Sequence, residues 1–158
     1  PDESVDIVLS SSCFEHSEMF WITFLEIMRV LKPHGLFYLN APSNGPFHRF
    51  PVDCWRFYPD SGNALVNWAK RNGIGARLLE SYTSFQRCDT GEPGIWNDLI
   101  AVILKDEAHL PTHPHRITDR IDTFMNVIRS DRAEIGNVVE LTEDQQKLRH
   151  IRHLTDGL

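Results

Sequence analysis

The chain has 158 residues, of which 41% are hydrophobic and 24% are charged, and its formal net charge is −6. This length allows one hydrophobic core rather than two comfortable domains, and the absence of a dense Lys/Arg block argues against nucleic-acid binding. Every apolar run is far shorter than the roughly 20 residues of a membrane-spanning helix, so no membrane association is expected.

The cysteines, Cys13, Cys54 and Cys88, are far apart and form no CxxC pair. This spacing disfavours a zinc ribbon or a disulfide framework, and a reducing, cytoplasmic compartment is expected. We expect the cysteines to act as small buried hydrophobic residues rather than as nucleophiles. The first residue is not Met, which suggests a trimmed chain or an incomplete reading frame.

The first quarter of the chain predicts a strand, a helix and a second strand. Residues 5–10 and 36–41 are apolar, and the first run is typical of a strand buried on both faces. Ser17 is a candidate N-cap, and Pro33 with Gly35 would end the helix. The apolar residues between these signals recur at helical spacing on one face: Phe20, Phe24, Ile27, Met28 and Leu31.

The middle of the chain predicts a long loop, a helix and an antiparallel strand pair. Residues 42–59 are rich in proline and aromatic residues, and loops of this length in a compact domain are usually functional or disordered. The aromatic content argues against disorder. A helix is expected over residues 60–71, ended by Asn72 and Gly73. Residues 77–85 and 99–105 read as strands, with a turn at residues 89–93 between them.

After Asp106 the composition changes, and we divide the chain into residues 1–106 and a helical extension, residues 107–158. Residues 109–115 form a linker rich in Pro and His. A helical stripe is expected from the spacing of Ile117, Ile121, Phe124, Met125 and Ile128. A last helix, carrying Leu148, Ile151 and Leu154, would begin with a capping box of Thr142 and Gln145.

Four short motifs follow one another in order over the first 42 residues. An acidic lead-in precedes the first strand, Glu15-His16 follows it, residues 29–35 read RVLKPHG, and Pro42 follows the second strand. This set resembles the C-terminal half of the class I, Rossmann-like methyltransferases that use S-adenosylmethionine, of the methyltransferase type 11 or UbiE/UbiG-like kind. His34 departs from the family's "PGG". The resemblance covers about residues 2–105 and implies an α/β fold: a partial Rossmann-like sheet of strands resembling the fourth to seventh, with C-terminal helices.

The resemblance implies where the cofactor and the catalytic groups lie. The end of the first predicted strand would face the methionine end of S-adenosylmethionine, through Ser11, Ser12, Cys13, Phe14 and Glu15. His16 is the candidate general base, and its alternative role is a hydrogen bond to backbone within the first turn. Glu15 is expected to cap or orient rather than to catalyse.

A second motif lies in the long loop, where residues 48–59 read HRFPVDCWRFYP. It resembles the H-x-x-P-x-D-x-W-R-F-x-P segment of methyltransferases that modify glycans and other bacterial surface or secondary metabolites. The resemblance places His48, Asp53 and Arg56 on the acceptor side as catalytic candidates. The alternative is a self-packed lid, with Trp55 and Phe57 buried and Asp53 paired with Arg56.

The predicted function is therefore transfer of a methyl group from S-adenosylmethionine to a small-molecule or glycan-like acceptor. The alternative is a non-catalytic half-domain that acts as an oligomerising or interaction module. No GxGxG occurs in the sequence, so we expect the isolated chain to bind the cofactor weakly, with a Kd of about 1 mM or weaker. We expect a homo-oligomer, with an interface drawn from the edge of the apolar strand at residues 5–10 or from the stripe at residues 117–128. We expect no metal, because the histidines of residues 109–115 lie in a linker without a fixed scaffold.

Overall fold

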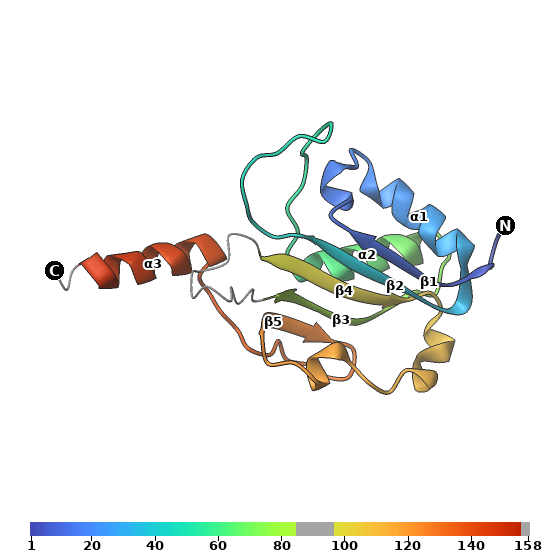
Figure 1. The fold of residues 1–158 in the computed structure, drawn as a ribbon. Coiled ribbons are helices and arrows are strands. Elements are labelled where there is room, and N and C mark those ends of the chain that lie inside the picture. The colour runs from blue at the N-terminus through green and yellow to red at the C-terminus, as the bar shows by residue number, and fades with distance from the viewer. Residues whose placement is uncertain (85–96, 156–158) are drawn as a thin grey trace.

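The computed structural model describes residues 1–84 and 97–155, and a five-stranded sheet with the order β1-β2-β4-β3-β5 runs through it (Figure 1). The strands are β1 (Val5–Ser11), β2 (Leu31–Pro42), β3 (Arg77–Ser84), β4 (Asp98–Leu104) and β5 (Phe124–Arg129). The α-helices are α1 (Phe20–Val30), α2 (Asp60–Arg71) and α3 (Glu143–Thr155), and short 3₁₀ helices are η1 (Phe14–His16), η2 (Glu107–Thr112) and η3 (Ile117–Asp119). The predicted α/β class is confirmed.

The sheet is mixed, as the sequence predicts. β1 pairs with β2 in parallel, so that Val8 lies opposite Phe37, and α1 connects the two strands. β4 pairs antiparallel with both β2 and β3, which confirms the predicted antiparallel pair. The predicted turn at residues 89–93 and Cys88 lie outside the described residues.

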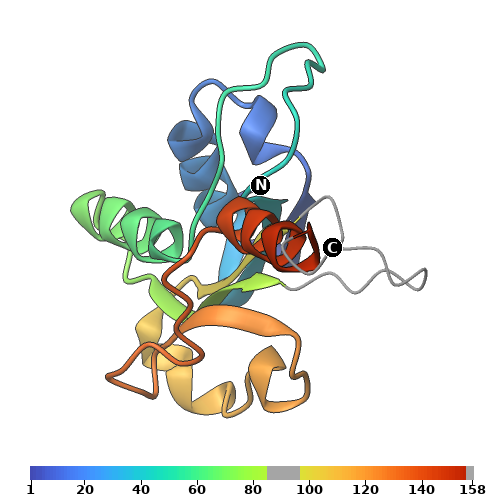
Figure 2. The ribbon, with the colours of Figure 1, turned by 90° about the vertical axis from the view of Figure 1, so that its left-hand side faces the viewer.

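The main core lies between the sheet and the helices α1 and α2, which cover one of its faces (Figures 1 and 2). From α1, Phe24 and Met28 are fully buried, which confirms the predicted apolar stripe of this helix. From α2, Leu65 and Ala69 pack into the same cluster. These contacts fix both helices so that their N-terminal ends lie next to the ends of β1 and β2.

α1 begins later and ends earlier than the sequence suggested. Its N-cap is Met19, and Ser17 instead ends η1, so the expected Ser17 cap is wrong. The helix ends at Val30, because Leu31 already has an extended backbone and Lys32 precedes a proline, a position that disfavours helix. Residues 32–35 then form a bulge, since the pairing jumps from Val5–Leu31 to Ile7–Leu36.

β1 is not buried on both faces, which corrects the expectation for this strand. Val8 faces the main core, but Ile7 and Leu9 on the other face are 58% and 73% exposed. The physical reason is the strand's position at the edge of the sheet. η2 and the segment after it cover Leu36 and Tyr38 on the neighbouring strand, and no described segment covers Leu9.

The stripe predicted as a helix from Ile117 to Ile128 is wrong. Ile117 lies in η3, whereas Met125 and Ile128 lie in β5, whose burial alternates with the period of a strand. β5 pairs antiparallel with β3 and so extends the sheet past the boundary that we placed at residue 106. That boundary stays a prediction.

A buried polar network holds this added segment against β3. The Glu80 carboxylate accepts hydrogen bonds from the backbone N–H of Thr118, at 3.1 Å, and from its hydroxyl, at 2.8 Å. Arg129 donates to the same hydroxyl and pairs with Asp119 and Asp131. Because buried charges are tolerated when paired in this way, the network explains polar residues on a buried strand without a functional role.

Two local predictions at helix ends are confirmed. α2 spans the predicted residues, and Gly73 beyond its end has a φ of +78°, a conformation in which glycine is unstrained. The capping box at α3 forms, since the backbone N–H groups and the side chains of Thr142 and Gln145 bond reciprocally. The apolar residues of α3, Leu148, Ile151 and Leu154, are exposed.

Among the described residues, no helix combines the length and the apolar character needed to cross a membrane.

Candidate functional site

The predicted cofactor-binding residues lie where β1 ends and η1 begins. Ser11, Ser12 and Cys13 are exposed there, and the Ser12 N–H donates to the carbonyl of Asn40 at 3.1 Å. Ser12 has a φ of +49°, so the chain turns sharply as it leaves the sheet. Phe14 differs, because its ring is buried and lies 5.6 Å from that of Phe37. The exposed groups available to a ligand are therefore those of Ser11, Ser12 and Cys13.

Glu15 and His16 form a polar pair on η1. Glu15 is only 1% exposed, and its Oε2 has no hydrogen-bond partner within the part of the chain that the structure describes. The other oxygen, Oε1, lies 3.6 Å from Nε2 of His16. The other ring nitrogen of His16, Nδ1, is hydrogen-bonded to the carbonyl of Val52. The predicted alternative for His16, a hydrogen bond to backbone, is thus present.

The long loop, residues 43–59, folds back onto this strand end (Figure 1). The Cys54 N–H donates to the Glu15 carbonyl at 2.8 Å, and the Trp55 indole N–H donates to the Ser17 carbonyl at 3.0 Å. Phe57 is buried in the main core, whereas Trp55 remains partly exposed. These contacts hold the loop against η1 and bring its motif to the end of β1.

The carboxylate of Asp53 accepts hydrogen bonds from two other residues of the long loop. Its carboxylate is 2% exposed and takes a bidentate pair of hydrogen bonds from the Arg56 guanidinium, at 2.5 and 2.9 Å. It also accepts the backbone N–H of His48 at 2.8 Å. The Arg56 hydrogen bonds, followed by that backbone N–H, hold the pKa of Asp53 well below its usual range despite burial. Asp53 is therefore ionised and orients its neighbours, as in the self-packed alternative.

The fold brings His16 and His48 together, although they are distant in the sequence. Their ring centroids lie 4.9 Å apart with the rings nearly perpendicular, and Phe50 packs beside both. With Glu15 they form a group whose candidate ligand atoms all lie within 4.8 Å of one another. Sequence reasoning named each residue but missed this juxtaposition, because the path of the loop sets it.

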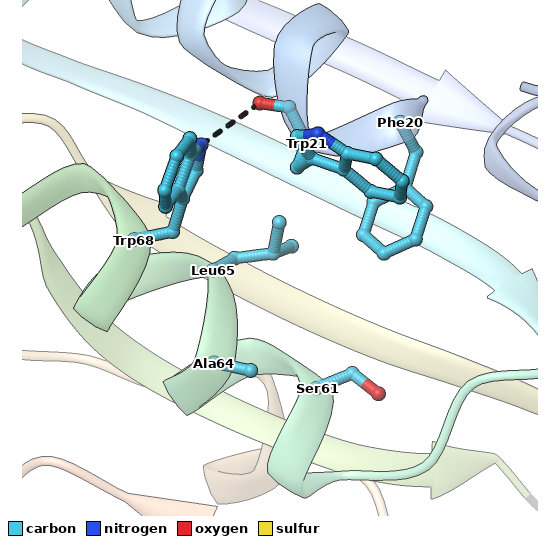
Figure 3. A pocket seen from close by; sticks show the side chains of 6 residues that line it. All are labelled: Phe20, Trp21, Ser61, Ala64, Leu65 and Trp68. Atoms are coloured by element: carbon cyan, nitrogen blue, oxygen red, sulfur yellow. Dashed lines mark hydrogen bonds between the residues drawn. The ribbon is translucent and has the colours of Figure 1, made fainter. Parts of the chain in front are cut away.

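An aromatic pocket adjoins the site between α1 and α2. Figure 3 shows its lining residues, Phe20, Trp21, Ser61, Ala64, Leu65 and Trp68, around a cavity of about 400 Å³. The indole N–H of Trp68 donates to the Trp21 carbonyl at 3.2 Å, which links the two helices. Trp55 of the long loop packs against Phe20 and Trp21. The sequence analysis missed this pocket, although the paired tryptophans at helical positions were a signal for it.

The cysteines depart from expectation. Cys13 and Cys54 are exposed rather than buried, because each lies on the connection between elements at the end of β1 and not within a core-facing stripe.

In the predicted histidine-rich linker, His113 contacts the backbone: its Nε2 lies 3.2 Å from the carbonyl of His34. Within the described residues, the group able to hold a metal ion is Glu15, His16 and His48.

The geometry can be compared with known proteins. A family model described as a methyltransferase domain matches residues 1–39. This match covers β1, η1, α1 and most of β2, and it confirms the resemblance over that part of the chain. A search among curated proteins found no match.

Solved structures resemble the chain weakly. One is the complex between the Haloferax volcanii Trm112 methyltransferase activator and its candidate methyltransferase, with 19% identity and a TM-score of 0.49, covering 73% of this chain and 57% of that chain. Another is a SAM-dependent methyltransferase from Aquifex aeolicus, with 15% identity and a TM-score of 0.38, covering 66% of this chain and 48% of that chain. The chain thus spans about half the length of these two structures.

Proposed function

We propose that this chain is part of an enzyme that transfers the methyl group of S-adenosylmethionine to a small-molecule or glycan-like acceptor, a proposal supported by the match of residues 1–39 to a methyltransferase-domain family model. The observation that carries the proposal is the assembly of Glu15, His16, His48, Asp53 and Arg56 at the end of β1. In open α/β sheets, ligands bind outside the carboxyl ends of the strands, and the assembly lies at that end.

The exposed groups after β1 suit the methionine end of the cofactor. The hydroxyls of Ser11 and Ser12 can donate and accept hydrogen bonds, and a cofactor carries an amino group and a carboxylate there. The sequence contains no GxGxG, so this chain would contribute the methionine end of the site. S-adenosylmethionine supplies an electrophilic methyl group, and the chain's own residues would hold the acceptor in line with it.

The imidazole of His16 is set up to accept a proton. The Val52 carbonyl can only accept a hydrogen bond, so in the neutral imidazole Nδ1 of His16 carries the hydrogen and Nε2 carries the lone pair. A hydroxyl acceptor must lose its proton during methyl transfer, and Nε2 is the general base that we propose for it. His48, oriented by Asp53 and Arg56, would position the acceptor beside it.

Cofactor binding by the full chain tests the proposal. Saturation-transfer difference NMR detects affinities near 1 mM, and we expect signal transfer to the methionine protons of S-adenosylmethionine. Cys13→Trp should remove the signal by filling the exposed strand end. Asp122→Trp, at an exposed position of the segment between η3 and β5, is the matched control and should preserve it. Equal signals in both variants would place the cofactor elsewhere and overturn the proposal.

A second candidate function has its own observation. The face of β1 that carries Ile7 and Leu9 is apolar and exposed, which favours an interaction module that associates through this strand. This candidate requires no cofactor. It predicts association without the NMR signal described above.

A further inference from the structure

We propose that Glu15, His16 and His48 form a binding site for a divalent transition-metal ion. These residues offer a carboxylate oxygen and imidazole nitrogens that lie within 4.8 Å of one another. A small inward movement would bring such donors onto one ion at bond lengths of about 2.0–2.2 Å. The inference concerns ion binding alone and does not rest on the proposed function. While an ion is bound, the Nε2 lone pair of His16 is occupied and cannot serve as the general base, so the two roles exclude each other at any moment.

The buried carboxylate of Glu15 is the first independent observation. Its Oε2 is fully enclosed but has no hydrogen-bond partner among the described residues. A buried polar atom without a partner costs about 1–3 kcal/mol, and more when it is charged. A cation bound at this oxygen would remove that cost. Ion binding would therefore stabilise Glu15 more than an ordinary surface carboxylate, whose oxygens are already hydrated.

The orientation of His16 is the second observation. Its Nδ1 is engaged by the Val52 carbonyl, and Nε2, which carries the lone pair in the neutral ring, lies 3.6 Å from Oε1 of Glu15. Metal-binding histidines almost always donate their other ring N–H to a carbonyl or a carboxylate, which fixes the ring and its tautomer. Val52 has this role for His16.

His48 has the same kind of outer support. Its Nδ1 lies 3.1 Å from the Pro46 carbonyl and 3.5 Å from a carboxylate oxygen of Asp53. Asp53 is itself held by Arg56, and the Arg56 guanidinium also donates to the Pro46 carbonyl. The loop thus provides the arrangement of a carboxylate behind an imidazole that is common at zinc sites.

The donor set selects a class of ion. Imidazole nitrogens with one carboxylate oxygen suit Zn²⁺, Co²⁺, Ni²⁺ or Fe²⁺, whereas Mg²⁺ and Ca²⁺ prefer oxygen donors. A set of this size leaves coordination positions open for water or a ligand. Because Glu15 and His16 come from η1 and His48 from the long loop, the ion would also tie that loop to the end of β1.

Metal titration of the full chain tests the site. The protein is dialysed against chelator and titrated with Zn²⁺ by calorimetry and with Co²⁺ by visible absorption. We expect one ion per chain, d–d bands of a low-coordinate Co²⁺ site, and weaker binding at lower pH because protons compete for the imidazoles. Failure of both ions to bind would overturn the proposal.

Variants locate the ion. Glu15→Gln and His48→Gln keep the size of the side chain but should weaken binding by roughly tenfold or more. His115→Gln is the matched control, since His115 is exposed and belongs to the histidine-rich linker. Asp53→Asn tests the outer support and should weaken binding without removing a ligand. Circular dichroism confirms that each variant folds.

The outcomes are distinct. If His115→Gln weakens binding as much as His48→Gln does, the ions bind the linker and the proposal is wrong. If Glu15→Gln and His48→Gln both bind the ion as tightly as wild type does, the proposal is also wrong. The main structural rival is a direct contact between His16 and Glu15 without an ion. That rival predicts no Co²⁺ bands at neutral pH.

Discussion

His48 is the residue through which the long loop reaches the end of β1. Its ring lies against that of His16, and its backbone is fixed by the Asp53 carboxylate. In an active form of the proposed enzyme, we expect His48→Ala to lower kcat/KM by roughly 10²-fold, because a positioning residue holds the acceptor in line for transfer and a misplacement of about 1 Å costs that much. Cofactor affinity should stay within about twofold, because the exposed groups after β1 remain.

The measurement is steady-state methyl transfer with calorimetry of the cofactor in parallel. Arg49→Ala is the matched control, since Arg49 is exposed in the same loop, and its kinetics should be nearly unchanged. Loss of cofactor binding in His48→Ala with unchanged acceptor kinetics would move the loop from the acceptor side to the cofactor side.

Asp53 makes loop stability depend on pH. Its folded pKa lies below its unfolded value, so the contribution is fully present above about pH 4 and is lost as the pH falls through the folded pKa. Asp53→Asn should cost about 1.5–3 kcal/mol at pH 7, the range for hydrogen bonds to charged groups. The gap between variant and wild type should narrow at pH 3.

Urea unfolding at a series of pH values measures that gap. Asp122→Asn, at an exposed position, provides the comparison and should match wild type at pH 7. A gap that stays constant from pH 7 to pH 3 would show that the Asp53–Arg56 pair contributes nothing through its charge.

At the scale of elements, the end of α2 gives a direct test of backbone conformation. Gly73 has a φ of +78°, and a Cβ there would meet nothing within 4 Å. Gly73→Ala should therefore destabilise the fold by about 1–2 kcal/mol through backbone strain alone. Gly73→Asn should cost less, because asparagine tolerates this conformation. Thermal unfolding of the variants distinguishes strain from packing, since a packing defect would make Asn the worse substitution.

The elements that the sequence predicted well share a physical property. α2 and the β3–β4 pair carry strong local signals, with an amphipathic period or β-branched runs bounded by stop residues. β5 was mistaken for a helix because Ile117, Ile121, Phe124, Met125 and Ile128 fit helical spacing, whereas the strand period is visible only over residues 124–129. Its partner β3 and the Glu80 network decide between the two, and both are distant in sequence.

The candidate site was predictable only in part for the same reason. The motifs identified His16, His48, Asp53 and Arg56 as polar groups near strand ends, and local spacing placed Asp53 with Arg56. The contact between His16 and His48 depends on how the loop returns to η1, through the Cys54–Glu15 and Trp55–Ser17 hydrogen bonds. No periodicity encodes such a path.

At the scale of the whole molecule, β1 combines a sheet edge that no other described strand pairs with and exposed apolar side chains. It lies at the edge of the sheet, and the apolar side chains of Ile7 and Leu9 are exposed beside that edge. The strand β5 does not cover this surface, since it pairs with β3 at the opposite edge of the sheet. A β-strand edge next to apolar surface is a template for pairing with another chain.

We therefore propose that the chain forms a homodimer through β1. A symmetric pair would place one β1 against the other, satisfy both rows of backbone groups and make Ile7 and Leu9 of the two copies cross-strand neighbours on one face of the joined sheet. Wild-type protein should sediment as a dimer at micromolar concentration and dissociate on dilution. The double variant Ile7→Lys with Leu9→Lys should be monomeric, because charged side chains oppose edge pairing. Val138→Lys, at an exposed apolar position elsewhere, should leave the dimer intact. A folded wild-type monomer at every concentration would contradict the proposal, and it would leave Ile7 and Leu9 as tolerated surface residues.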